Sequence, residues 1–374
     1  MKLTGDVGAP WRAPMLVLGF VSLFAGIAAG LTRLGWPLPA ANLAAVHGPL
    51  MVSGFFGTVI SLERAVALRE RWAYGAPLFS ALGALAAIVA APALLAPALV
   101  TAGSAVMLAA SVAVYRRQQE LFTLTLALGA LSWLAGNLVW LGGAAVYAAV
   151  PWWVAFLVLT IAGERLELSR FLPPSPRAKR VFAALIVVLL GGVAASLVTR
   201  AAGTIALGAA LAGLALWLAR QDVARRTVRT KGLTRFIAIC LLSGYVWLAV
   251  SGASMLFSGG LAYGGTAYDA ALHAVLLGFV FSMVIGHAPI ILPAVLRVAV
   301  PYSAYFYAPL ALLHGSLAIR LIGDWIGSPQ WRAWGGALNA IALLVFVLGT
   351  VAAVIRGQLR RGRARAAMPG GSPQ

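Results

Sequence analysis

The sequence predicts an all-α polytopic membrane protein with about 12 transmembrane helices and cytoplasmic N and C termini. Of its 374 residues, 62% are hydrophobic and only 10% are charged. The apolar residues gather in windows of about 20, the length that crosses a bilayer as a helix. This composition is typical of integral membrane proteins and exceeds what a soluble core requires.

Twelve predicted spans follow one another along the chain with short connections between them. The first six cover residues 14–32, 41–67, 75–94, 97–115, 121–143 and 146–168. The last six cover residues 181–199, 203–219, 235–257, 268–295, 302–322 and 333–355. Residues 1–365 are expected to form a single 12-helix membrane domain, or two subdomains divided near the polar connection 221–234. Residues 366–374 are expected to form a disordered tail.

The basic residues predict the orientation of the chain. The formal net charge is +19, but the Lys and Arg residues lie in short connections between apolar spans and not in a soluble basic domain. Membrane lipid is therefore the expected partner, and nucleic acid is not. If the N-terminus is cytoplasmic, four of the 28 basic residues face outward and the other 24 face inward, as the positive-inside rule requires. The four are Arg33, Arg200, Arg320 and Arg332.

All four histidines of the chain fall within predicted spans. They are His47, His273, His287 and His314. A titratable ring at bilayer depth is costly without a partner, so intramembrane histidines indicate a functional site. His273 and His287 are fourteen residues apart in one span, and fourteen α-helical steps end within about 40° of the starting direction. We therefore expect these two rings to face the same neighbours.

Depth arithmetic predicts that His47 and His273 meet. At about 1.5 Å per residue, His47 lies roughly 10 Å and His273 roughly 12 Å to the outer side of the midplane, on separate helices. Two neutral imidazoles at one level match the axial ligation of a low-spin haem. The chain has one cysteine and so cannot contain a Cys-x-x-Cys-His segment, which makes haem b the expected type. Arg33 or Arg320 would pair with its propionates.

His287 and His314 are predicted metal ligands at separate centres. Their depths differ by roughly 12 Å, which disfavours one metal held by both. Copper is the metal considered for such a centre. The alternative for each ring is a hydrogen-bonded core or proton-relay histidine.

Small residues and charged pairs allow two readings each. Glycines follow the first histidine at Gly48, Gly54 and Gly57, where they would admit a flat macrocycle or serve ordinary helix packing. The second and sixth spans end in similar pairs, Glu63-Arg64 and Glu164-Arg165. These pairs are read as snorkelling helix ends, or as a proton entry or propionate contact.

Three segments carry a resemblance to a known family. They are Val46-His-Gly-Pro-Leu-Met-Val-Ser-Gly-Phe-Phe-Gly57, Ile161-Ala-Gly-Glu-Arg165 and Leu272-His-Ala-Val-Leu-Leu-Gly-Phe-Val-Phe-Ser-Met-Val-Ile-Gly286. In this order they resemble the NnrS-type haem–copper membrane proteins, twelve-span bacterial proteins tied to nitric oxide and denitrification stress. The resemblance implies haem or copper binding by His47 and His273, and a place in the bacterial cytoplasmic (inner) membrane as a multi-pass protein. Leu50 stands where that family has an acidic residue.

A wider likeness is to the catalytic subunit of haem–copper oxidases, which also has twelve helices and a low-spin haem between its second and tenth. The adjacent His-His pair and the His-x-His pair of that subunit are absent here. Oxygen reduction is therefore not expected.

The leading prediction is a haem-binding integral membrane protein, with copper as a second metal. It would act in the response to nitric oxide or a related small gaseous ligand, in its detoxification, or in electron transfer with an electron-donor protein. As an enzyme it would be a haem-dependent oxidoreductase. The alternative is a proton-coupled or metal-ion transporter that uses the intramembrane histidines with Glu63 and Glu164. A third reading is a scaffold for a respiratory complex.

Overall fold

The chain is an all-helical protein with the build of a multi-pass membrane protein. A computed structural model describes residues 5–169 and 173–366, with side chains up to residue 360. Within these residues, eleven helices are long and apolar enough to cross a membrane. The predicted fold class is thus confirmed at the level of a polytopic helical protein.

The helices follow the predicted spans closely. The first half contains α1 (Ala9–Arg33), α2 (His47–Pro49), the π-helix η2 (Leu50–Gly57), α3 (Thr58–Leu68), α4 (Gly75–Ile88), α5 (Leu95–Arg117), α6 (Leu121–Leu141) and α7 (Val146–Leu168). The second half contains α8 (Pro176–Ala195), α9 (Arg200–Gln221), α10 (Ala224–Thr227), α11 (Gly232–Phe257), α12 (Thr266–His273), the π-helix η5 (Ala274–Phe281), α13 (Ser282–Leu296), α14 (Tyr307–Trp325) and α15 (Pro329–Ala366). Short 3₁₀ segments are η1 (Ala41–Val46), η3 (Arg71–Tyr74) and η6 (Ala304–Phe306).

The third predicted span differs from the rest. It forms α4, which has 14 residues and is shorter than the roughly 20 that cross the hydrocarbon core. The chain turns at Ala90, whose φ of 52° lies in the left-handed region, and Pro92 follows shortly after. A proline so soon after this turn opposes continuation of the helix, so α4 ends earlier than apolar composition alone suggests.

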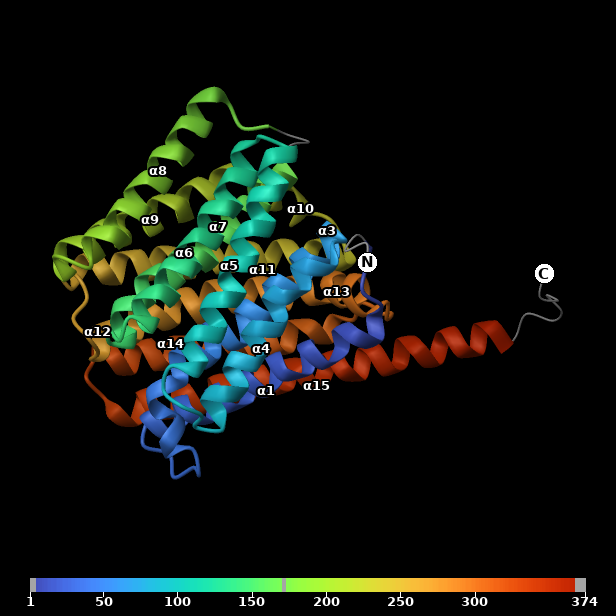
Figure 1. The fold of residues 1–374 in the computed structure, drawn as a ribbon, viewed down its shortest axis with the longest axis horizontal. Helices are drawn as coiled ribbons and strands as arrows, with labels where there is room; N and C mark the ends of the chain where they lie inside the picture. Colours follow the sequence, from blue (N-terminus) through green and yellow to red (C-terminus); the bar gives the residue numbers. More distant parts are fainter. Residues whose placement is uncertain (1–4, 170–172, 367–374) are drawn as a thin grey trace.

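Helix α1 begins and helix α15 ends at the same end of the bundle, and α15 continues past the other helices there (Figure 1). Such an arrangement is what an even number of passages produces. The polar connection 221–234 holds α10, which packs against α11. Of the tail predicted at 366–374, residue 366 is the last residue of α15, and residues 367–374 lie outside the described residues.

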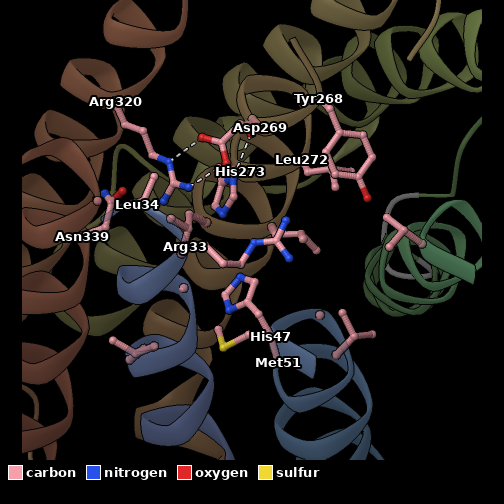
Figure 2. Close-up of a pocket in the computed structure, with 18 of the residues that line it drawn as sticks. Arg33, Leu34, His47, Met51, Tyr268, Asp269, Leu272, His273, Arg320 and Asn339 are labelled. Atoms are coloured by element: carbon pink, nitrogen blue, oxygen red, sulfur yellow. Dashed lines mark hydrogen bonds and ion pairs between the residues drawn. The ribbon is translucent and has the colours of Figure 1, made fainter. Parts of the chain in front are cut away.

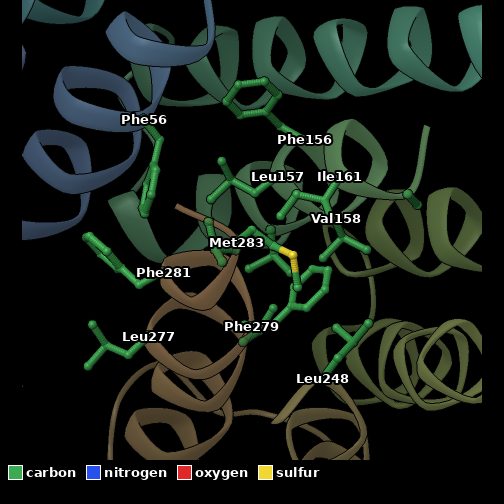
Figure 3. Packing of buried hydrophobic residues seen from close by; sticks show 14 of the residues in the cluster. Phe56, Phe156, Leu157, Val158, Ile161, Leu248, Leu277, Phe279, Phe281 and Met283 are labelled. Atoms are coloured by element: carbon green, nitrogen blue, oxygen red, sulfur yellow. The ribbon is translucent and has the colours of Figure 1, made fainter. Parts of the chain in front are cut away.

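The core of the bundle is centred on α7. Its residues 153–159 are all fully buried, because other helices surround this segment on every side. Phe156, Leu157 and Val158 of α7 belong to one apolar cluster with Phe279 and Phe281 of η5 (Figure 3). A helix that is apolar all round is buried, which is the packing that the uniform composition of α7 requires.

The helices that carry His47 and His273 share a rare local structure. Each passes into an eight-residue π-helix soon after its histidine, η2 in one case and η5 in the other. π-helical turns are uncommon and occur frequently at functional sites. The two segments contact each other: the rings of Phe55 and Phe281 are 5.7 Å apart and 8° from parallel.

A candidate cofactor pocket between two histidines

A cavity of about 480 Å³ opens between the π-helical spans. Its wall is built by α1, by α2 with η2, by α7, by α12 with η5, and by α14 and α15. This volume lies in the range of about 300–1,000 Å³ that is usual for cofactor and small-molecule sites. The pocket therefore has room for an organic group as well as for a single ion.

His47 and His273 face each other across this pocket. Their ring centroids are 6.4 Å apart and their planes are 21° from parallel. Figure 2 shows the two rings pointing toward one another, with Arg33 reaching in beside them. The predicted meeting of two imidazoles from the second and tenth spans is what the structure shows.

The main chain fixes which nitrogen of each ring faces the cavity. Nδ1 of His47 is 2.7 Å from the carbonyl oxygen of Gly26 on α1. Nδ1 of His273 is 2.8 Å from the carbonyl oxygen of Asp269, one helical turn earlier. A ring whose Nδ1–H donates to a carbonyl carries its lone pair on Nε2. Neither Nε2 atom has a hydrogen-bond partner among the described residues.

The separation of the rings fits two ligands of one metal. A metal–imidazole bond is about 2.0 Å and the nitrogen lies about 1 Å from its ring centre, so two trans imidazoles have centroids roughly 6 Å apart. The observed 6.4 Å agrees with that value. In the described part of the chain, no cluster of three or more His, Cys, Asp or Glu residues is placed to hold a metal ion. Further ligands at His47 and His273 would therefore have to come from another kind of side chain on the wall, such as Met51, or from the bound group itself.

Three arginines line the pocket, and two of them face carboxylates of the protein. Arg320 is paired with Asp269, and Nη1 of Arg332 lies 3.9 Å from Oδ1 of Asp324. Among the described residues, Arg33 bonds only to a carbonyl and a hydroxyl oxygen, so its guanidinium suits an anionic end of a ligand. The remainder of the wall is mostly apolar, with Met51, Phe56 and Phe281 among its residues.

One glycine makes space for the His47 ring, and others serve helix packing. A Cβ atom on Gly30 of α1 would lie 2.8 Å from Cε1 of His47. A Cβ atom on Gly54 would lie 2.0 Å from Oγ of Ser22, and one on Gly57 would lie 2.4 Å from Cζ2 of Trp133. Of the two readings of the glycines after His47, helix packing therefore applies to Gly54 and Gly57, whereas Gly48 lines the pocket.

His314 lies in a different environment. Its Nδ1 accepts a hydrogen bond of 2.7 Å from Nε1 of Trp247, and its Nε2 is 3.1 Å from Oγ of Ser243. Both ring nitrogens are thus engaged by protein groups on α11. The arrangement matches the hydrogen-bonded core reading given above for this ring.

His287 meets a buried ion pair. Its Nδ1 is 2.8 Å from the carbonyl oxygen of Met283, and its Nε2 is 3.5 Å from Nη1 of Arg165. Nε of Arg165 donates to Oδ2 of Asp222 at 2.8 Å, and the Tyr245 hydroxyl donates to the same oxygen. A cation beside Nε2 opposes the approach of a metal ion to His287.

His273 and His287 therefore meet different neighbours, and the expectation that they share one face is wrong. The arithmetic assumed α-helix throughout, but η5 lies between them. A π-helix turns through a smaller angle per residue than an α-helix because its hydrogen bonds span five residues.

The two similar Glu-Arg pairs, Glu63-Arg64 on α3 and Glu164-Arg165 on α7, lie close to each other: Nη2 of Arg64 is 3.6 Å from Oε1 of Glu164.

A family model described as Domain of unknown function (DUF8744) matches residues 12–355. The chain belongs to the DUF8744 family. No curated protein matches it. The DUF8744 match spans all four histidines and the whole pocket. The resemblance to the NnrS-type proteins stays a prediction, so the geometry of the pocket carries the functional proposal.

Sequence reasoning missed Asp269 and Arg332 as pocket residues. A signal for Asp269 existed, because it precedes His273 by four residues and so lies on the same helix face. Arg332 gave no such signal, since its place beside the pocket depends on how α15 returns along α14.

Proposed function

We propose that the pocket binds a b-type haem whose iron is ligated by His47 and His273. The facing of these two rings at 6.4 Å is the observation that carries the proposal. Three further features support it: Nδ1 of each ring is occupied, the cavity is of cofactor size, and arginines line it. Arg33 is the residue that would face the propionates, because Arg320 is paired with Asp269 and Arg332 with Asp324.

Electron transfer is the activity that this arrangement supports best. A haem in this pocket would supply reversible one-electron reduction. His47 and His273 would together hold the iron, since Nδ1 of each ring is engaged by the main chain and Nε2 is left for a metal. The surrounding apolar side chains would exclude water. A site of this kind accepts and passes on an electron without binding a substrate to the metal.

A function in binding nitric oxide or a related small ligand would require a different metal site. A gaseous ligand would need a free coordination position on the metal, which two bound histidines would not leave. Carbon monoxide added to the reduced protein tests this directly. We expect an unchanged absorption spectrum, and a carbon monoxide adduct would favour the gas-binding function.

The second candidate function is handling of a metal ion, and the same two rings favour it. A copper ion held by two imidazoles alone would also suit a separation of 6.4 Å. It would leave most of the 480 Å³ cavity and its arginines without a role. A colourless protein that retains copper after purification would support this candidate and the transporter reading that goes with it.

We further propose that the pocket faces the outer side of a bacterial cytoplasmic membrane. The positive-inside rule favours cytoplasmic termini and an even number of passages, and twelve result if α4 is counted with the eleven long helices. Figure 1 is consistent with an even number, because α1 begins and α15 ends at one end of the bundle. The electron-donor protein would then approach from the outer side.

The test is the absorption spectrum of the full-length protein purified from membranes in detergent. We expect a Soret band and, after reduction with dithionite, sharp α and β bands typical of a low-spin haem. Extraction of the pigment as its pyridine complex would identify the haem type. A preparation from haem-replete cells with no Soret band would overturn the proposal.

A further inference from the structure

The two histidines of the pocket both direct Nδ1 to a main-chain carbonyl oxygen, and they differ in whether a carboxylate lies beside that nitrogen. On His47 the acceptor is a neutral carbonyl oxygen, that of Gly26, at 2.7 Å. On His273 the N–H lies 2.8 Å from the carbonyl oxygen of Asp269 and 3.2 Å from Oδ1 of the same residue. Only His273 therefore has an anionic group close to its Nδ1, although the hydrogen bond itself goes to the carbonyl oxygen.

The carboxylate of Asp269 is held in place by a second residue. Nε and Nη2 of Arg320 donate to Oδ2 and Oδ1 of Asp269, each at 2.8 Å. A two-point pairing of this kind fixes the orientation of a carboxylate as well as neutralising its charge. The side chain of Arg320 is only 9% exposed, so solvent screens the pair weakly. The contacts thus run from Arg320 through Asp269 to His273, which lines the pocket.

A carboxylate behind a metal-bound imidazole changes the ligand. The negative charge of Asp269 lies 3.2 Å from Nδ1 of His273, and it would raise the basicity of the nitrogen that binds the metal. A more basic ligand would stabilise the higher oxidation state of the iron, because ferric iron carries more positive charge. His47 has only the neutral carbonyl oxygen at its Nδ1, so the two rings would be unequal as ligands.

We propose that Asp269 is a positioning residue that acts through His273 to lower the reduction potential of the haem. This inference rests on the proposed function. Arg320 has the opposite effect, since its positive charge draws electron density away from the carboxylate. The pair together sets the potential, and removal of either member shifts it in a predictable direction.

The experiment is a spectroelectrochemical titration of the purified, haem-loaded full chain. Asp269→Asn removes the charge and keeps the size, and we expect the midpoint potential to rise. Arg320→Gln leaves the carboxylate without its counterion, and we expect the potential to fall. Asp269→Glu retains an anionic group and should stay closer to wild type than Asp269→Asn does.

Asp324 provides the comparison for a nearby carboxylate that is not paired with a histidine. It is a buried carboxyl group on α14, one turn after Arg320, and its Oδ1 lies 3.9 Å from Nη1 of Arg332. If the effect of Asp269 depends on its place beside Nδ1 of His273, Asp324→Asn shifts the potential less. It should also leave the electron paramagnetic resonance signal of the ferric haem unchanged, whereas Asp269→Asn alters that signal.

An unchanged or lowered potential in Asp269→Asn would overturn the inference, as would an equal shift in Asp324→Asn. If Asp269→Asn does not retain haem, Arg320→Gln decides: a lowered potential supports the inference and an unchanged or raised potential overturns it. Failure of the proposed function is a separate outcome, because a wild-type protein without haem has no potential to titrate.

Discussion

The pocket around His47 and His273 and the region around His287 and His314 use the same residue type in opposite ways. In the pocket, Nδ1 of each ring is hydrogen-bonded to a main-chain carbonyl oxygen, and Nε2 faces the cavity. At His314 both nitrogens have protein partners, and at His287 the second nitrogen faces a guanidinium. All four rings lie within spanning helices.

Burial alone therefore does not identify a histidine as a metal ligand. A buried ring must satisfy its polar atoms, and the partner it finds decides its role. Where protein groups satisfy both nitrogens, the ring stabilises helix packing. Where one nitrogen faces a cavity of cofactor size, the unsatisfied lone pair is available to a ligand.

The largest expected effect comes from removing either pocket ring. His47→Ala and His273→Ala should each abolish the low-spin haem spectrum, because one axial ligand disappears. His287→Ala and His314→Ala should keep the spectrum of the wild type. Haem content per chain, measured after extraction, checks both halves. Loss of haem in His314→Ala with full retention in His47→Ala would reverse the comparison.

A methyl group placed beside the His47 ring tests the position of that ring without replacing a histidine. Gly30→Ala would bring a carbon atom to 2.8 Å from the ring, so the imidazole must move and its bond to Gly26 must weaken. We expect loss of a large fraction of the bound haem. Gly315→Ala is the matched control on α14, because nothing lies within 4 Å of the added carbon among the described residues. Equal haem retention in both variants would argue against the assigned ring position.

The ion pair beside His287 should matter for folding and not for the cofactor. Arg165→Gln leaves the buried Asp222 without its counterion, which typically costs about 3–5 kcal/mol of stability. We expect a clear fall in the temperature of unfolding in detergent, while the haem spectrum of the surviving folded protein stays unchanged. A shifted spectrum at unchanged stability would instead place Arg165 in the cofactor site.

The smallest effect concerns the cluster at the start of the chain. Burial raises the pKa of Asp6, but hydrogen bonds from Tyr74 and Arg12 lower it more, so its pKa lies below the usual value. A carboxyl group with a depressed pKa stabilises the fold above its unfolded pKa of about 3.9, and this contribution is lost as the pH falls through the folded value.

Thermal unfolding of wild type and Asp6→Asn, followed from about pH 6 down through about 3.9, measures the contribution. We expect the wild type to be slightly more stable at the upper end, and the difference to shrink as the pH falls below the unfolded pKa. The haem spectrum should not follow this change. A difference that grows as the pH falls would contradict the sign.

Most of the fold followed from apolar windows, because a lipid environment leaves few choices except helices of bilayer length. The meeting of His47 and His273 followed from depth, since position along a spanning helix fixes height. The direction of the His287 ring was not predicted correctly. The prediction assumed the rotation per residue of an α-helix, and the π-helix η5 between His273 and His287 rotates less per residue. The partners of His314 and His287, Trp247 and Arg165, could not be predicted either, because long-range pairing between helices leaves no periodicity in the sequence.

The most direct test of the paired ligation is the electron paramagnetic resonance spectrum of the oxidised wild-type protein. Two imidazole ligands whose planes are 21° from parallel predict a rhombic low-spin ferric signal. A high-spin ferric signal would show that His47 and His273 do not both bind the iron, and the central claim would then be wrong.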